Sequence, residues 1–449
     1  MSDQTTPDRC CVVGLGYVGL NLAHLFTEAG YPTVGYDIDE KKITALQRGH
    51  DPTGEFPDGT FADRPIEFTS SPEAIGDCEF VFIAVPSPLD EHSDPDLSSL
   101  KAASETVGEH LSADAIVVYE STLYPGATRE ELRPALERGA QKQEGTPFRV
   151  GYSPERIIPG SDSKQATDIT KLVSAEDKPT RDRLEALFEE VMAGEVYPTE
   201  TIETAEAAKC LENAQRDLNI ALVNEFTRGA SQLESDLDPY AVLEAAGSKW
   251  CFYDYQPGIV GGHCLPVDPH YLRYKFEEAG YEPQLLTTSR AVNERMRSHV
   301  AEIAIEALAS TSDVTPPQEA SLVRGDGSGQ PDSRLLLLGL SYKPNVTDLR
   351  NSPAFGVADE LQAHGIDVVG YDPLDESGVA AETFDFEIQS EVDFTGFDGA
   401  VVLTAHDELR SLDLETAAEA MSENPVFVDV DNAFDTTAVT AAGFSYWGL

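Results

Sequence analysis

One cysteine of the chain, Cys264, lies in the segment GGHCLPVDP (residues 261–269), after two glycines and a histidine. A thiolate that a reactant can reach is a nucleophile, and paired glycines would leave open space in front of the sulfur. The alternative is a small buried thiol that fills a hole in an apolar core. His263 is not expected to act as its base, because neighbouring side chains on an extended loop point apart. The segment alone does not decide between nucleophile and core thiol.

A second chemical signal lies in residues 10–39, where an apolar run is followed by a glycine turn, an amphipathic run and another apolar run. The turn has the pattern GxGxxG, and Asp37 ends the second apolar run about 20 residues later, as in a dinucleotide-binding unit. The helix N-terminus would face the phosphates, while an aspartate there accepts hydrogen bonds from a ribose 2′-hydroxyl and repels a 2′-phosphate. We therefore predict binding of NAD rather than NADP. The expected contacts are Gly14, Gly16, Tyr17, Val18, Gly19 and Asp37.

Further apolar runs in the first 160 residues end in proline, serine and threonine. Ligands of open α/β sheets bind at the carboxyl ends of the strands, so these side chains are predicted to lie beside the cofactor. They are Pro86, Ser87, Ser121 and Thr122. The segment FRVGYSPERIIPG (148–160) repeats the arrangement and carries Glu155 at the end of its predicted strand.

Residues 201–235 have helical periodicity. Glu206, Lys209, Asn213 and either Arg216 or Asp217 are three or four residues apart and share one face, which is either a solvated face or part of a site. Apolar residues cover more of the circumference than one contact within a domain needs, which predicts the core of a two-fold dimer or higher oligomer. These apolar residues are Leu218, Ile220, Leu222, Val223 and Phe226.

The C-terminal part repeats the N-terminal pattern in altered form, with LLLLGLSYKP at 335–344 and VVGYDP at 368–373. Ser341 and Pro344 replace glycines of the first copy, so a second dinucleotide is not expected to bind in the same way. Lys343, Asp348 and Arg350 follow the first strand of this copy. The two cations suit the phosphates of a substrate or form a mere surface pair, and both interpretations stay open here.

The chain has 449 residues, of which 41% are hydrophobic. We predict an α/β fold: two Rossmann-like domains with parallel sheets (1–200 and 334–449), a helical central domain (201–310), and a linker or surface insertion (311–333). The six cysteines form no CxxC pair and no zinc-ligand spacing, so no metal is expected.

The net charge is −49, from 31 basic and 80 acidic residues. This balance repels nucleic acid and anionic membranes, and neither is expected as a partner. The acidic residues are scattered rather than gathered in a tail, which favours a surface adapted to high salt. No apolar run approaches the roughly 20 residues of a membrane span, and the first residues lack a signal-peptide layout. A cytoplasmic protein is therefore expected.

Five motifs, GLGYVGL, SPERIIPG, AEAAKCLENAQRDLNIALVNE, GIVGGHCLPVDP and LSYKPNVTDLRNSP, stand in the order found in the nucleotide-sugar 6-dehydrogenase family. That family includes UDP-glucose, GDP-mannose and UDP-N-acetylhexosamine dehydrogenases. The resemblance covers residues 9–449 except the 311–333 segment. It implies oxidation of a sugar C6 alcohol to a carboxylate with two NAD and one water, and it makes Cys264 the nucleophile that carries a thiohemiacetal and then a thioester.

The resemblance also implies the other catalytic roles. Lys209 and Asn213 correspond to the pair that stabilises the developing oxyanion. Glu155 corresponds to the acid/base carboxylate, and Asp268 to a carboxylate that helps activate the thiol or the water. Thr122 corresponds to a residue that positions water and cofactor.

By the same resemblance, Arg350 reaches NAD and Lys343 contacts a UDP-sugar substrate. Pro159 replaces a second glutamate of some UDP-glucose enzymes, and Ser87 stands where threonine is common. Segments 247–265 and 212–225 look most like the UDP-N-acetylglucosamine or UDP-N-acetylgalactosamine branch. The implied substrate contacts are Glu155, Lys209, Asn213, Lys249, Tyr253, Gly258, Gly261 and Lys343.

The sugar depends on a few pocket contacts worth about 1 to 3 kcal/mol. UDP-glucose, UDP-N-acetylmannosamine and GDP-mannose therefore stay open as substrates. A dehydrogenase that removes a single hydride and a non-catalytic NAD-binding protein are the alternatives from other classes. The number of NADH formed per sugar, which is two, one or none, separates the three.

Overall fold

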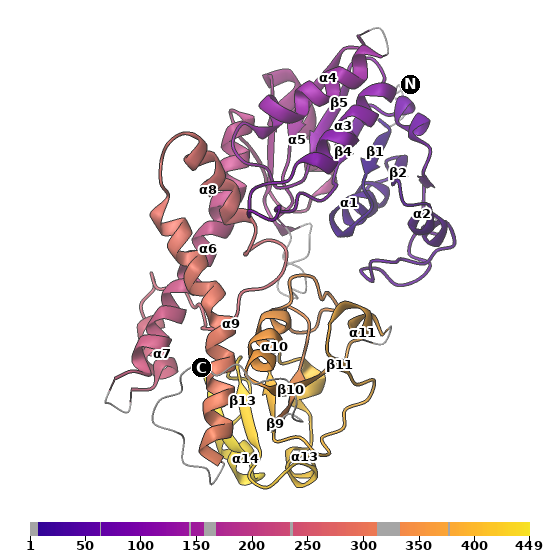
Figure 1. The fold of residues 1–449 in the computed structure, drawn as a ribbon. Helices are drawn as coiled ribbons and strands as arrows, with labels where there is room; N and C mark the ends of the chain where they lie inside the picture. Colours follow the sequence, from indigo (N-terminus) through magenta and orange to yellow (C-terminus); the bar gives the residue numbers. More distant parts are fainter. Residues whose placement is uncertain are drawn as a thin grey trace. The chain divides into compact units, whose positions relative to one another are not determined.

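The structure is a computed structural model, and it describes residues 8–62, 64–142, 145–156, 168–233, 237–311, 333–375 and 378–449 (Figure 1). Pro159 and almost all of the predicted 311–333 insertion lie outside these residues. The chain divides into two compact units. Unit 1 consists of Met1–Asn213 and Val267–Pro283, and unit 2 of Ala214–Pro266 and Gln284–Leu449. The predicted division into three domains with a linker stays a prediction.

Unit 1 is built on an eight-stranded sheet in the order β3-β2-β1-β4-β5-β6-β7-β8. Its strands are β1 (Cys10–Val13), β2 (Thr33–Tyr36), β3 (Ile66–Thr69), β4 (Phe80–Ile83), β5 (Ala115–Tyr119), β6 (Phe148–Tyr152), β7 (Lys171–Ala175) and β8 (Val196–Pro198). All neighbouring strands are parallel except β6 and β7. The helices are α1 (Tyr17–Glu28), α2 (Glu40–Gln47), α3 (Ser98–His110), α4 (Arg133–Gln141), α5 (Lys178–Val191) and α8 (Asp268–Glu278).

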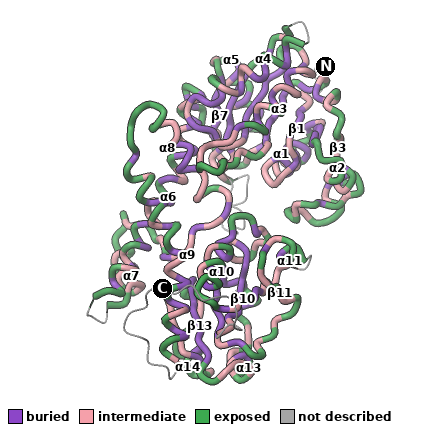
Figure 2. The backbone as a smooth tube through the Cα atoms, viewed as in Figure 1, coloured by how far each residue is buried: buried purple, intermediate pink, exposed green. Residues whose placement is uncertain are grey.

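The central strands of unit 1 are buried along their whole length, because helices cover both faces of a parallel sheet (Figure 2). Cys10 and Cys11 of β1 and Cys78, which precedes β4, are buried. Phe26 of α1 and Phe188 of α5 pack on Phe82 of β4, with ring centroids 4.7 and 5.8 Å apart respectively. The apolar runs of the sequence therefore form the sheet that presents polar strand ends.

Unit 2 is built on a six-stranded parallel sheet in the order β11-β10-β9-β12-β13-β14. Its strands are β9 (Ser333–Leu338), β10 (Ile366–Tyr371), β11 (Glu387–Ile388), β12 (Gly399–Val402), β13 (Val426–Asp429) and β14 (Ser445–Gly448). Its helices are α7 (Pro239–Gly247), α9 (Gln284–Thr311), α10 (Pro353–Ala363), α11 (Val379–Thr383), α12 (Asp407–Arg410), α13 (Leu414–Ala420) and α14 (Thr436–Ala441).

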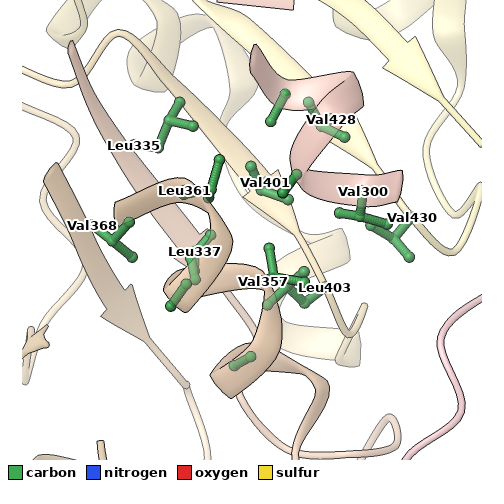
Figure 3. Packing of buried hydrophobic residues seen from close by; sticks show 14 of the residues in the cluster. Val300, Leu335, Leu337, Val357, Leu361, Val368, Val401, Leu403, Val428 and Val430 are labelled. Atoms are coloured by element: carbon green, nitrogen blue, oxygen red, sulfur yellow. The ribbon is translucent and has the colours of Figure 1, made fainter. Parts of the chain in front are cut away.

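One face of this second sheet packs against helices α9 and α10. Figure 3 shows Leu337 of β9 and Val401 of β12 in the same cluster as Val357 of α10 and Val300 of α9, and all four are fully buried. The two Rossmann-like units with parallel-dominated sheets confirm the predicted fold class. Within the described residues, the structure contains no helix that is both long and apolar enough to cross a membrane.

Helix α6 (Ile202–Ala230) is the long helix predicted from periodicity, and it crosses from the residues of unit 1 into those of unit 2. Its exposed apolar side chains include Leu211 and Leu222, which are 60% and 63% exposed. The dimer predicted for this helix stays a prediction.

Candidate active site

The glycine turn of unit 1 joins β1 directly to α1. Gly14 has φ +89°, a conformation that side chains disfavour, and a Cβ on Gly19 would lie 1.8 Å from the carbonyl oxygen of Gly14. A Cβ on Gly16 would meet no atom within 4 Å. Helix α1 begins at Tyr17 without a side-chain cap, so the first backbone N–H groups lack an intrahelical acceptor and can bind phosphate.

Asp37 lies at the end of β2 and is buried beside this turn. Its Oδ2 accepts from Leu15 N at 2.8 Å and from Lys42 Nζ at 2.7 Å, and its Oδ1 accepts from Asp39 N at 3.0 Å. Burial opposes ionisation, but Lys42 and the two amides outweigh burial and lower the pKa of Asp37. A carboxylate has about four acceptor positions, so Oδ1 keeps one for a ribose hydroxyl. The turn and Asp37 together fit NAD.

The loops that follow β4 and β5 are tied together at the carboxyl edge of the sheet. Ser87 Oγ donates to Thr122 O at 3.0 Å, and Ser121 Oγ donates to Val85 O at 2.6 Å. Tyr271 of α8 donates to Ser87 O at 2.8 Å. The predicted strand-end residues are therefore held in one hydrogen-bonded layer.

A second group in unit 1 converges on Asp268, the first residue of α8. Asn213 Nδ2 donates to Asp268 Oδ2 at 2.5 Å, and Lys209 Nζ lies 3.7 Å from the same oxygen. The Thr122 hydroxyl also bonds this carboxyl. Burial raises the pKa of Asp268 despite the opposing effects of Lys209, Asn213 and Thr122. Four of the predicted catalytic residues therefore meet within one unit.

The polar face predicted on residues 201–235 is not a solvated face. Glu206, Lys209 and Asp217 are buried. Glu206 accepts from Gly126 N at 2.5 Å and Thr128 N at 2.9 Å, and so fixes the loop after β5 that carries Thr122. Sequence reasoning placed Glu206 on this face and did not find its function as a loop anchor.

Glu155 lies after β6, next to two charged residues that no motif singled out. Its backbone N–H donates to Glu120 O at 3.1 Å. Lys171 Nζ lies 2.6 Å from Glu120 Oε2 and 3.7 Å from Glu155 Oε2. Both Glu120 and Lys171 are buried, and a charged residue at the end of an apolar strand was the available signal.

In unit 2, Cys264 is exposed on the turn that follows Gly261 and Gly262. A Cβ on Gly262 would lie 2.7 Å from the ring of Tyr342, and one on Gly261 would lie 3.0 Å from Tyr342 Cβ. The sequence analysis explained this glycine pair by open space in front of the sulfur, and that explanation was wrong. Tyr342 fills that space, and the glycines allow its close approach to the backbone.

Asp348 links the cysteine loop to the loop after β9. Its Oδ2 lies 2.6 Å from His263 Nε2, and it accepts from Arg350 Nε at 3.0 Å and Nη2 at 2.9 Å. Burial opposes ionisation, but His263 and Arg350 hold the pKa of Asp348 well below its usual range. Asn351 Nδ2 also donates to Gly262 O at 3.2 Å. Arg350 is thus paired with a carboxylate, and Lys343 on the same loop is half-buried.

The stretch before Cys264 is fixed by amide side chains of two helices. Gly258 N donates to Asn224 Oδ1 at 2.8 Å, and Asn224 Nδ2 donates to Gly258 O at 3.0 Å and to Asn293 Oδ1 at 2.9 Å. Sequence reasoning missed both asparagines. Lys249 and Tyr253, the other predicted substrate contacts of this stretch, are exposed. Across the described ranges, no group of three or more His, Cys, Asp or Glu side chains could hold a metal ion.

The fold and these residues define a class: an oxidoreductase with an NAD-binding Rossmann unit and a second Rossmann-like unit with an altered turn. The chain matches three models of the UDP-glucose/GDP-mannose dehydrogenase family. These are the NAD binding domain over residues 8–192, the central domain over 203–295 and the UDP binding domain over 336–436. The chain belongs to this family of NAD-dependent nucleotide-sugar dehydrogenases.

Similar proteins extend over most of the chain. Protein CapL of Staphylococcus aureus is 39% identical over 84% of this chain and 85% of its own length. UDP-N-acetyl-D-glucosamine 6-dehydrogenase of Salmonella typhi is 37% identical over 91% of this chain and 92% of its own. The solved UDP-D-ManNAc dehydrogenase from Pyrococcus horikoshii is 30% identical, with a TM-score of 0.82 over 98% of both chains. The predicted enzyme class and NAD as cofactor are confirmed.

Proposed function

We propose that the enzyme oxidises the C6 hydroxyl of a UDP-N-acetylhexosamine to the uronate, consuming two NAD and one water. The Salmonella typhi relative, a UDP-N-acetyl-D-glucosamine 6-dehydrogenase, supports this sugar class. The Pyrococcus horikoshii neighbour acts on UDP-N-acetylmannosamine by its name, so that sugar is the first alternative, followed by UDP-glucose. The observation that carries the four-electron reaction is the exposed Cys264 thiol on a loop fixed at Gly258 and Gly262.

The chemistry requires a nucleophile between two oxidations. NAD held by the glycine turn and Asp37 would supply the hydride acceptor for each of the two oxidations. The aldehyde that the first oxidation of C6 leaves has no further hydride to give until a nucleophile adds to it. The Cys264 thiolate adds to the aldehyde carbon and forms a thiohemiacetal, which loses the second hydride and becomes a thioester. Water then cleaves the C–S bond, giving the carboxylate and returning the thiol.

We assign the charge and proton transfers to the polar residues of unit 1. Lys209 and Asn213 present an ammonium and an amide N–H, which stabilise an oxyanion better than water does in a closed site. The raised pKa of Asp268 suits proton transfer nearer neutrality. Glu155 exchanges the proton of the reacting oxygen or water, and Thr122 orients that water.

Binding is assigned by the same argument. NAD is bound by the glycine turn, Asp37 and the strand ends after β4 and β5, with Arg350 reaching it as well. The UDP-sugar is bound by Lys343 of the loop after β9, and by Gly258 and Gly261 of the cysteine loop. Lys249 and Tyr253 complete its contacts. The match of residues 336–436 to a UDP binding domain supports this assignment.

The test is the fate of Cys264 variants. The parent is expected to form two NADH per UDP-sugar in molar salt. Cys264→Ala is expected to lose steady-state uronate formation while still binding NAD and UDP-sugar. Cys264→Ser, whose hydroxyl is a weaker nucleophile, is expected to accumulate an ester adduct of sugar mass, which mass spectrometry of the intact protein detects.

Cys251 provides the matched control, because it is the other exposed cysteine and lies on the same stretch. Cys251→Ala should keep two NADH per sugar. Uronate formation by Cys264→Ala near the parent rate would refute the nucleophile role. One NADH per sugar in the parent would make the protein a single-hydride dehydrogenase. Repeating the assay with the N-acetylglucosamine, N-acetylgalactosamine, N-acetylmannosamine and glucose forms ranks the substrates.

A further inference from the structure

Three charged side chains form a cluster at the carboxyl end of β5 and β6 in unit 1. Glu120 directly follows β5, Glu155 follows β6, and Lys171 is the first residue of β7. The ammonium of Lys171 lies 2.6 Å from Glu120 Oε2 and 3.7 Å from Glu155 Oε2. One buried cation is therefore placed between two carboxylates.

The cluster is deeply buried on one side and open on the other. The side chains of Glu120 and Lys171 are 0% and 5% exposed, whereas that of Glu155 is 17% exposed. An isolated buried charge costs several kcal/mol, so Glu120 and Lys171 need each other. Within the described residues, Glu120 Oε1 has no hydrogen-bond partner. The hydrogen bond of the Glu120 carboxylate is thus made through Oε2, to Lys171.

The remaining contacts of Lys171 place its ammonium toward Glu155. Pro154 O lies 3.5 Å from Nζ, and the Phe188 ring centroid lies 5.2 Å away. A lysine has three N–H donors. The Glu120 contact and the weak one to the Pro154 carbonyl leave a donor for Glu155 Oε2.

Glu155 is held at both oxygens. Its Oε1 accepts from Arg156 N at 2.6 Å, and its Oε2 faces Lys171. The Arg156 guanidinium is directed elsewhere, to Glu212 of α6 at 2.7 Å and to Thr170 O at 2.5 Å. Lys171 is therefore the cation that faces the Glu155 carboxylate among these contacts.

The charge states fit this arrangement. Burial raises the pKa of Glu120 to about 7 against the attraction of Lys171, and the charge of Glu155 adds to the rise. Burial opposes the charge of Lys171, but Glu120 and Glu155 outweigh burial and raise its pKa. Lys171 thus stays an ammonium at neutral pH, while its buried partner changes charge there.

We propose that Lys171 is a positioning residue for Glu155, with Glu120 as its buried anchor. Lys171 fixes the orientation of the Glu155 carboxylate by facing it with a positive charge, and Glu120 competes for the same cation. This inference rests on the proposed acid/base function of Glu155. A purely structural ion pair between the segments of β5 and β7 would stabilise the sheet without influencing the reaction.

Two variants separate these roles through the pH profile of kcat. In Glu120→Gln the ammonium of Lys171 no longer contacts Glu120 and keeps its contact with Glu155. The acid limb of the kcat profile should therefore move to lower pH. The double variant Glu120→Gln with Lys171→Met removes both buried charges together and leaves neither uncompensated. Its acid limb should move to higher pH by about one unit, with kcat at pH 7 reduced about tenfold or more. KM for NAD and UDP-sugar should change by less than about threefold, because binding groups are untouched.

Three controls make the outcome decisive. Lys178→Met removes an exposed lysine of the same unit that pairs with Asp182, and it should leave the profile unchanged. Lys171→Arg keeps the charge and should keep the acid limb near the parent position, which tests the proposal even if the double variant does not fold. Limbs that do not move, or that move in the same direction in Glu120→Gln and the double variant, would overturn the positioning role. Glu155→Gln separates the positioning role from the acid/base function on which it rests. If this variant is inactive, the acid/base function of Glu155 stands even where the positioning role fails. If it has the parent rate, both are excluded, while the function proposed for Cys264 is tested independently by its own variants.

Discussion

The two Rossmann-like units begin with the same hydrogen-bond arrangement. Gly14 N donates to Tyr36 O at 2.8 Å in unit 1, and Gly339 N donates to Tyr371 O at 2.9 Å in unit 2. The next amide donates to the aspartate that ends the second strand, Leu15 to Asp37 at 2.8 Å and Leu340 to Asp372 at 2.7 Å. The aspartate therefore supports the turn in both units, whatever else it binds.

The units differ in the segment that comes after the turn. In unit 1 helix α1 begins at once, at Tyr17, whereas in unit 2 helix α10 begins only at Pro353. The intervening loop is fixed by buried His406, whose Nε2 lies 3.0 Å from Ser341 Oγ and whose Nδ1 accepts from Asn345 N at 3.0 Å. The same strand–turn scaffold thus presents a helix N-terminus in unit 1 and a loop with Lys343 and Arg350 in unit 2.

The largest effect is expected for Gly19→Ala. This substitution disrupts the close packing of α1 on the glycine turn, which unit 2 lacks. The new Cβ would lie 1.8 Å from Gly14 O, so α1 must move off the turn, at a cost of about 3 kcal/mol. NAD binding, measured by titration, should weaken at least about a hundredfold if the phosphates bind the helix N-terminus. UDP binding should persist. Gly229→Ala, where a Cβ meets no atom within 4 Å, is the control, and normal NAD affinity in Gly19→Ala would contradict the helix-terminus site.

A smaller effect is expected when the aspartate that ends the second strand of each unit is replaced. The property measured is the preference for NAD over NADP. Asp37→Ala removes the acceptor for the ribose and leaves Lys42 without its carboxylate, so the ratio of kcat/KM for NAD over NADP should fall about tenfold or more. Asp372→Ala changes the equivalent residue of unit 2 and should leave the ratio unchanged. Equal use of both cofactors by the parent protein would show that Asp37 does not select NAD.

The smallest effect concerns the shared structural role. Burial opposes ionisation of Asp372, but His406 and the amides of Leu374 and Leu340 outweigh burial and lower its pKa. A lowered pKa stabilises the fold above the unfolded pKa near 4, and this stabilisation is lost as pH falls through the folded value. Asp372→Asn should therefore reduce the free energy of unfolding by about 1 kcal/mol at pH 7, and the deficit should shrink toward pH 3. Denaturant unfolding at both pH values in molar salt measures it, and a deficit that does not change with pH would exclude the charge as its source.

Local signals were sufficient to predict the geometry of the glycine turn and the position of Asp37. The three glycines and Asp37 lie within one strand–helix–strand unit, so their spacing predicts their geometry. The reason for Gly261 and Gly262 could not be found in this way, because the ring that fills their space belongs to Tyr342, 80 residues later in the chain. The buried Glu120–Lys171 pair was missed for the same reason, since 51 residues separate its partners.

The sequence by itself determined the two mainly parallel sheets, the glycine turn and the family, because hydrophobic periodicity and short glycine motifs act over neighbouring residues. Only the tertiary structure decided which charges meet. Asn213 reaches Asp268 across 55 residues and Asp348 reaches His263 across 85, and such pairs form where strand ends and helix starts converge. Burial in those places shifts the pKa of Asp268 upward, whereas partner charges shift that of Asp348 downward. The desolvation and the partner charges that cause these shifts arise from the packing of distant segments.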